Sequence, residues 1–205
     1  MDTALQAVTG ETCAAPARLL EPMGQPTPMM LVGVITYNPD VGRLRELCLE
    51  LSGDGIEILL IDNQSDNVQD ICDEFDRDSD IRVVRNPENI GLAAAVNQLV
   101  EFARGARARY IMPVDQDSKF DACYATNMLG NFHELQADLP LLAAMGAKVF
   151  DVRKRAYQRF MRFGHTRVER RTFSGGLPNR YVDTDFLITS GTVVSLDCVD
   201  QIGPM

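Results

Sequence analysis

The chain has 205 residues, of which 45% are hydrophobic and 24% charged, and this composition is typical of one globular domain of ordinary size. Acidic residues outnumber Lys and Arg by 29 to 20, and the resulting net charge of −9 disfavours a nucleic-acid partner. No apolar run approaches the ~20 residues that cross a bilayer, so we expect no membrane-spanning helix. The N-terminus has no basic region followed by an apolar block, and the five cysteines form no C-x-x-C pair. We therefore expect a cytoplasmic protein.

The first 28 residues lack the pattern of a packed domain. They contain four prolines and no sustained apolar period, which favours irregular chain. We expect residues 1–28 to form a flexible N-terminal arm and residues 29–205 to form the folded domain.

From residue 29 onward, strand patterns and helix patterns alternate along the chain. Continuous apolar runs predict strands buried on both faces, at 29–36, 56–62, 81–84 and 110–114. Apolar residues at helical spacing predict helices over 41–51, 68–75, 90–103 and 122–135. Four successive strand–helix units predict an α/β fold with a mainly parallel sheet and helices on both faces.

After Phe150 the predicted strands are no longer separated by helices. Strand patterns occur at 157–163, 167–173 and 181–188, which predicts a mixed or antiparallel C-terminal part. Charge is also segregated there, because residues 153–171 hold eight Arg or Lys and one acid. That segment is +7, so the rest of the chain is −16 (−9 − 7). A solvated face of two strands is one explanation of this charge.

Polar residues follow each of the four predicted parallel strands, where open α/β sheets bind their ligands. They are Thr36–Asn38, Asp62–Ser65, Asn86–Gly91 and Asp115–Ser118. The chain has neither a G-x-G-x-x-G after the first strand nor a P-loop. A bound phosphate would therefore need another device to hold it.

Asp115 and Asp117 are the clearest candidates for that device. Side chains two residues apart share a face of extended chain, so both carboxylates would meet at one spot. Mg²⁺ or Mn²⁺ favours such oxygen ligands and completes its coordination with water and substrate diphosphate. A solvated acidic turn is the alternative interpretation of this pair.

Two other strand ends also have more than one interpretation. Asp62 is either a helix N-cap or a carboxylate that accepts the N3–H of uracil or thymine. Asn89 and Gly91 either form the turn that opens the third helix or help that helix N-terminus to face an anion.

Five motifs in this chain occur in the order seen in family-two glycosyltransferases of the GT-A fold. The motifs are Thr36-Tyr37-Asn38, Ile61-Asp62-Asn63-Gln64-Ser65, Asn89-Ile90-Gly91 through Ala94 to Asn97, Val114-Asp115-Gln116-Asp117-Ser118 and Ile188-Thr189-Ser190-Gly191. The resemblance covers about residues 29–205 and is closest to bacterial rhamnosyltransferases. It implies an inverting, metal-dependent transfer of a sugar from a pyrimidine nucleotide sugar. The implied sugar is rhamnose, and the implied donor is dTDP-rhamnose or a UDP-sugar. The implied acceptor is a glycan or a lipid-linked glycan in polysaccharide or O-antigen biosynthesis.

The resemblance also implies roles for individual residues. Asp62 would read the pyrimidine, Asp115 would lie near the ribose, and Asp117 with Asp115 would hold Mg or Mn. The full implied nucleotide-sugar site is Thr36, Tyr37, Asn38, Asp62, Asn63, Asn89, Gly91, Asn97, Asp115 and Gln116. The basic segment 153–171 would meet anionic lipid or the acceptor's diphosphate, which would place the protein at the inner face of the membrane.

The catalytic base is not assigned by the sequence. An inverting transfer needs a carboxylate that takes the acceptor proton, and the resemblance places it after a Gly-Pro-like turn that here is Gly203-Pro204. We therefore expect the base beyond Met205 and a domain incomplete at its C-terminus. Asp183 and Asp185 precede the Ser-Gly motif and are not given this role.

Two alternatives stand beside the transferase. In a haloacid-dehalogenase-type phosphohydrolase Asp115 would be the nucleophile, but that motif closes the first strand, whereas Asp115 closes the fourth. A non-catalytic nucleotide-binding module is the other alternative.

Overall fold

The structure is a computed structural model that describes residues 11–12, 27–78, 80–151, 153–164, 168–171 and 181–203. Most of the segment expected to be a flexible arm lies outside these residues. Two residues of that segment, Glu11–Thr12, form a short strand, β1, at one edge of the main sheet.

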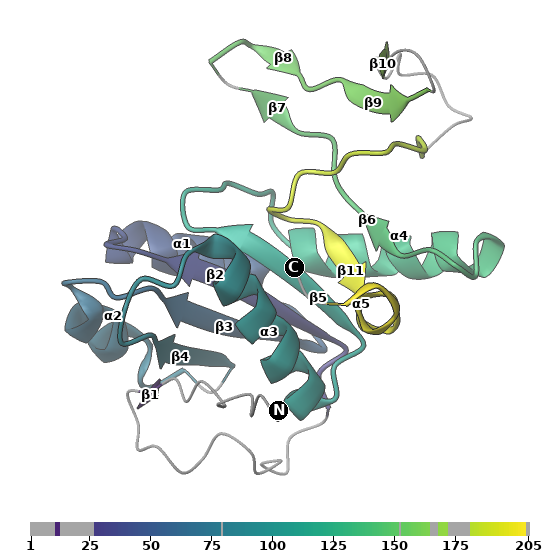
Figure 1. Cartoon of the computed structure of the whole chain (residues 1–205). Coiled ribbons are helices and arrows are strands. Elements are labelled where there is room, and N and C mark those ends of the chain that lie inside the picture. Colours follow the sequence, from purple (N-terminus) through teal and green to yellow (C-terminus); the bar gives the residue numbers. More distant parts are fainter. Residues whose placement is uncertain are drawn as a thin grey trace, which may run out of the picture.

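The centre of the molecule is a sheet of seven strands in the order β1-β4-β3-β2-β5-β11-β6 (Figure 1). Its four central strands are parallel, as predicted, and they are β2 (Met30–Thr36), β3 (Ile56–Asp62), β4 (Ile81–Arg85) and β5 (Tyr110–Asp115). The chain first winds outward from β2 to β4 and then returns to place β5 on the other side of β2. The strand order therefore reverses between β2 and β5, where open α/β sheets bind ligands.

Helices cover both faces of this sheet, as the strand–helix pattern predicts (Figure 1). On one face lie α1 (Val41–Leu51), α2 (Val68–Phe75) and α4 (Tyr124–Asp138), and on the other lie α3 (Leu92–Ala106) and α5 (Leu196–Ile202). The two cores follow from strand alternation, since Val32 packs on the first face and Leu31 on the second. No helix in the described ranges is long and apolar enough to cross a bilayer.

Gly33 in β2 lets α3 lie close to the sheet. A Cβ atom added at Gly33 would lie 2.5 Å from Cδ2 of Leu99, which is itself fully buried on α3. Any larger residue would push α3 away from β2, because a packed interior offers no space to move into. This contact sets how closely the middle of α3 packs against β2.

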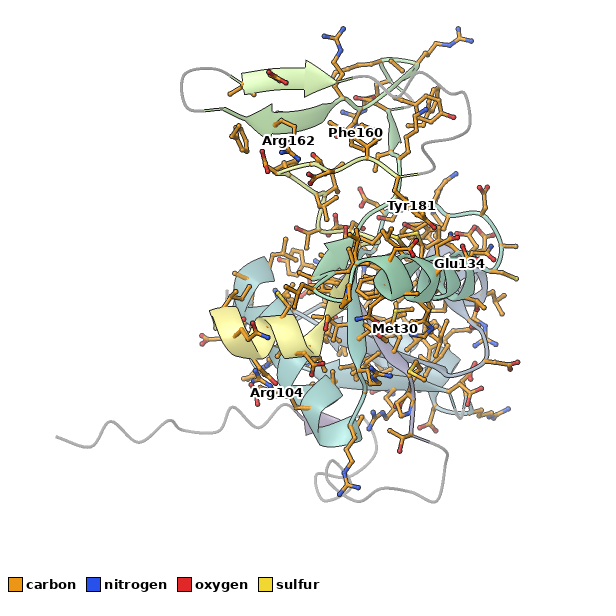
Figure 2. The ribbon with its side chains drawn as sticks, turned by 90° about the vertical axis from the view of Figure 1, so that its right-hand side faces the viewer. Met30, Arg104, Glu134, Phe160, Arg162 and Tyr181 are labelled. Carbon is orange, nitrogen blue, oxygen red and sulfur yellow. The ribbon has the colours of Figure 1, made fainter. Side chains whose placement is uncertain are left out.

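The C-terminal part is mixed, as predicted. Strands β6 (Ala144–Met145) and β11 (Val193–Ser195) extend the main sheet, and β11 runs antiparallel to both β5 and β6. Two small hairpins project from the sheet (Figures 1 and 2). They are β7 (Phe150–Asp151) with β8 (Ala156–Tyr157), and β9 (Phe160–Phe163) with β10 (Val168–Arg171).

The strand predicted at 181–188 is wrong, because this segment forms no strand ladder. Its backbone and side chains instead bind β9. The N–H of Asp185 and the hydroxyl of Thr184 both donate to the carbonyl of Met161, at 2.9 and 3.0 Å. Polar side chains that form hydrogen bonds with nearby backbone compete with strand pairing. The spacing of apolar residues, on which the prediction rested, does not reveal such bonds.

Candidate functional site

An open hollow of about 270 Å³ lies at the carboxyl ends of β2 and β5, where the strand order reverses. This volume is close to the lower limit of about 300 Å³ for small-molecule sites. The hollow is lined by Ile35, Thr36, Tyr37, Asn63, Leu92, Asp115, Gln116 and Asp117. Six predicted site residues thus come together, whereas Asn38, Asp62, Asn89, Gly91 and Asn97 are not in its lining.

Asp62 lies beneath the hollow and is fully buried. Its Oδ1 accepts a hydrogen bond from the hydroxyl of Thr36 at 3.2 Å, and its Oδ2 accepts one from the N–H of Ser65 at 3.0 Å. It is not the N-cap of α2, which is Asn67. In this structure Asp62 braces the ends of β2 and β3, and its contact with a pyrimidine stays a prediction.

Asn63 is the side chain at the end of β3 that lines the hollow. Its Oδ1 accepts from the N–H of Ile90 at 3.1 Å and from Nδ2 of Asn86 at 3.3 Å, and its Nδ2 donates to Oδ1 of Asn89 at 2.9 Å. Asn86 and Gln98 also exchange two hydrogen bonds. A network of uncharged amides therefore joins the ends of β3 and β4 to α3.

The same network positions the start of α3. The N–H of Gly91 donates to Oδ1 of Asn89 at 3.0 Å, and Gly91 adopts a φ of +79° as the N-cap of the helix. This left-handed φ favours glycine. No side chain caps the helix at this end, and Leu92, its first residue, lines the hollow. Asn97 lies half-buried further along α3.

Asn38 ties the turn after β2 to the turn after β3. Its N–H donates to Oγ of Ser65 at 2.7 Å, and its Oδ1 accepts from the N–H of Asp66 at the same distance. Asn38 has a φ of +48°, in the left-handed region that asparagine tolerates better than most residues. Its role in this structure is to shape the turn that presents Tyr37.

Asp115 and Asp117 both line the hollow, and neither carboxylate accepts a hydrogen bond or ion pair within the part of the chain that the structure describes. Partial burial raises the pKa of Asp115, and the neighbouring Asp117 carboxylate raises it further. The pair thus concentrates unneutralised negative charge on one side of the hollow.

Ser190 and Gly191 hold the segment that carries these two carboxylates. Oγ of Ser190 accepts from the N–H of Asp115 at 2.9 Å and lies 2.7 Å from Oγ of Ser118. The N–H of Gly191 donates to the carbonyl of Pro113 at 2.8 Å. The Ser-Gly motif is part of the family resemblance but has no role assigned from the sequence. In the structure it holds the end of β5 in place.

The donor set fits a divalent cation. Mg²⁺ is usually bound through one or two carboxylates together with substrate phosphates, and the hollow supplies two carboxylates. No group of three or more His, Cys, Asp or Glu side chains gathers at one point within the described ranges. A cation held by this pair would therefore need oxygens from its substrate or from water.

Asp183 and Asp185 are engaged elsewhere. Both form ion pairs with Arg162 of β9, and Oδ2 of Asp185 also accepts from the N–H of Phe163 at 2.7 Å. These contacts give both carboxylates a structural task in the projecting hairpin.

Residues 31–203 match the family Glycosyl transferase family 2. The crystal structure of S. aureus TarS 1–349 is similar, with a TM-score of 0.57 and 13% identity over 84% of this chain and 48% of that one. A second crystal structure of S. aureus TarS has a TM-score of 0.43 and 19% identity, covering 51% and 19% of the two chains. No curated protein matches the chain. The α/β fold with its mainly parallel sheet and antiparallel strands matches the GT-A type, and the chain spans about half of the first structure.

Replacing Asp62 by alanine should lower the free energy of unfolding by about 1–3 kcal/mol, because the Thr36 hydroxyl and the Ser65 N–H would remain buried without an acceptor. Urea denaturation measures this loss. The matched control is Asp66→Ala, since the Asp66 side chain is exposed and its loss should change stability by less than about 0.5 kcal/mol. Equal stability of Asp62→Ala and wild type would contradict the bracing role.

Proposed function

The chain belongs to Glycosyl transferase family 2, and on that premise we propose that it transfers a sugar, rhamnose, from a pyrimidine nucleoside-diphosphate donor to a glycan or lipid-linked acceptor. The observation that carries the proposal is the hollow between the ends of β2 and β5. It combines an aromatic side chain, an amide and two carboxylates that have no partner among the described residues, at the point where the strand order reverses.

The diphosphate of the donor belongs beside Asp115 and Asp117. These carboxylates would repel a diphosphate in the absence of a cation, so the charge pattern favours a divalent ion between them. Mg²⁺ or Mn²⁺ held there supplies charge neutralisation for the leaving nucleoside diphosphate. Leu92, the first residue of α3, also lines the hollow, so the start of this helix adds N–H groups without a side-chain cap at its edge.

The nucleoside belongs against Tyr37 and Asn63. Tyr37 is 52% exposed and lines the hollow, so its ring is available for stacking. Nδ2 of Asn63 donates one hydrogen bond to Asn89, and its second hydrogen can be donated to a carbonyl of the base. Asp62 acts beneath this layer by orienting Thr36.

The inverting course of the reaction is part of the same proposal. It requires a carboxylate to take the proton of the acceptor hydroxyl. Because Asp183 and Asp185 are paired with Arg162, we do not assign either as the base. Release of dTDP from dTDP-rhamnose in the presence of a synthetic lipid-linked acceptor distinguishes a transferase from a module that only binds nucleotide.

The hairpins at 150–171 support a peripheral membrane contact as a further part of the proposal. None of the described side chains of this segment is buried. The rings of Phe150 and Tyr157 pack edge to face at 5.1 Å, and Nζ of Lys148 lies 3.8 Å from the centre of the Tyr157 ring. The guanidinium groups of Arg153, Arg155 and Arg159 are exposed and form no ion pair with the residues that the structure describes. Exposed rings beside unpaired cations suit an anionic lipid surface.

Asp117→Asn should abolish the metal-dependent part of nucleotide binding, because it removes a ligand charge while keeping the shape of the side chain. In wild type, dTDP or UDP with Mn²⁺ should raise the melting temperature, since a ligand at about 100 times its Kd adds about 2.7 kcal/mol. ADP and GDP should raise it much less.

The control for Asp117→Asn is Asp121→Asn, an exposed aspartate outside the hollow lining whose replacement should leave the Mn²⁺ effect unchanged. An equal Mn²⁺ effect in wild type and Asp117→Asn would exclude the metal role of this carboxylate. Equal stabilisation by purine nucleotides would refute pyrimidine selectivity.

Vesicle sedimentation tests the membrane contact. The triple variant Arg153→Ser, Arg155→Ser and Arg159→Ser should lose affinity for phosphatidylglycerol-containing vesicles on the order of a hundredfold, because each cation contributes about 1 kcal/mol near an anionic surface. The control replaces three exposed arginines elsewhere, Arg43, Arg77 and Arg85, by serine. It has the same net charge as the first triple variant and should bind these vesicles more tightly than that variant does. If the wild type bound pure phosphatidylcholine vesicles as tightly as phosphatidylglycerol-containing vesicles, a charge-driven contact would be ruled out.

A further inference from the structure

We infer that Gln116 is a positioning residue whose side-chain amide joins the two segments leaving β2 and β5 and thereby sets the width of the donor hollow. The inference rests on the proposed function, because it concerns the same hollow. Gln116 stands between the two carboxylates that line it.

The amide of Gln116 pairs with both backbone polar groups of one residue. Its Oε1 accepts from the N–H of Tyr37 at 2.7 Å, and its Nε2 donates to the carbonyl of Tyr37 at 3.0 Å. Two hydrogen bonds to one peptide residue fix the orientation of the amide as well as its distance. A side chain that only covered the surface would not need this reciprocal geometry.

The position of this bridge along the sheet explains what it does. The ladder between β2 and β5 ends at the pair Ile35 and Asp115. Beyond that pair no backbone hydrogen bond joins residues 37–40 to residues 116–120, all of which the structure describes, and Tyr37 and Gln116 lie on these two segments. The amide of Gln116 therefore continues the strand pairing past the end of the ladder.

The bridge joins two segments that both line the hollow. Tyr37 lies on the segment after β2, and the carboxylates of Asp115 and Asp117 lie on the segment at the end of β5. On its far side the carboxylate segment is already held by Ser190, which accepts from the N–H of Asp115. With Gln116 the segment is fixed from two directions, so both carboxylates keep a set distance from Tyr37 while remaining free to bind a ligand.

Exchange of the Tyr37 amide hydrogen tests the bridge directly, without any ligand. Gln116→Met keeps the length of the side chain and removes both hydrogen bonds. It should speed exchange of the Tyr37 N–H by about tenfold, the effect of losing one hydrogen bond, with little change in melting temperature. Unchanged exchange of the Tyr37 amide in the variant would overturn the inference.

Nucleotide binding by calorimetry tests the consequence for the hollow. In Gln116→Met the ratio of dTDP affinity with Mn²⁺ to that without Mn²⁺ should fall by about tenfold, because the carboxylates no longer keep their distance from the nucleoside. The matched control is Gln69→Met, which loses one hydrogen bond to Asp73 on the surface of α2 and should change neither readout.

The two readouts separate this inference from the proposed function. If wild type shows no Mn²⁺-dependent nucleotide binding, the proposed function fails, and the exchange of the Tyr37 amide still decides whether Gln116 joins the two segments. If wild type shows that binding and Gln116→Met retains the full Mn²⁺ ratio, the positioning role is wrong although the proposed function stands.

Discussion

The reversal of strand order between β2 and β5 is the constraint on which the rest of the site depends. It makes two neighbouring parallel strands end side by side while their chains continue in different directions. Polar backbone and side-chain groups at such ends cannot be satisfied by the ladder and need other partners. Asp62, Gln116 and Ser190 supply those partners. The hollow is the space that these braces keep open.

The braces leave a distinct charge pattern. On the side of β3 and β4 the partners are neutral amides, namely Asn63, Asn86 and Asn89. On the side of β5 two carboxylates have no partner among the described residues. Negative charge is therefore confined to one wall, where a diphosphate can be held only through a cation. This division of the hollow into a neutral wall and an acidic wall matches a donor with a nucleoside at one end and a diphosphate at the other.

Much of this arrangement follows from the sequence. The four buried strands and the helices between them follow from apolar periodicity, and the strand-end rule brings Thr36, Asn63 and Asp117 to one hollow. Asp62 and Asn63 are both predicted site residues, but only Asn63 lines the hollow. The Asp62 side chain is fully buried and already accepts from Thr36 and Ser65, contacts that the strand-end rule does not reveal. Strand β11 could not be predicted, because its three residues pair with partners distant in sequence.

Paramagnetic line broadening by Mn²⁺ can show whether the hollow at the ends of β2 and β5 binds a metal–nucleotide complex. Mn²⁺ would be titrated into the ¹⁵N-labelled protein with and without dTDP, and the amide signals followed. If the complex binds there, broadening is strongest around Asp115–Asp117, extends to Tyr37 and Asn63, and deepens when dTDP is added. Broadening centred on another acidic region, or unaffected by dTDP, would contradict binding there.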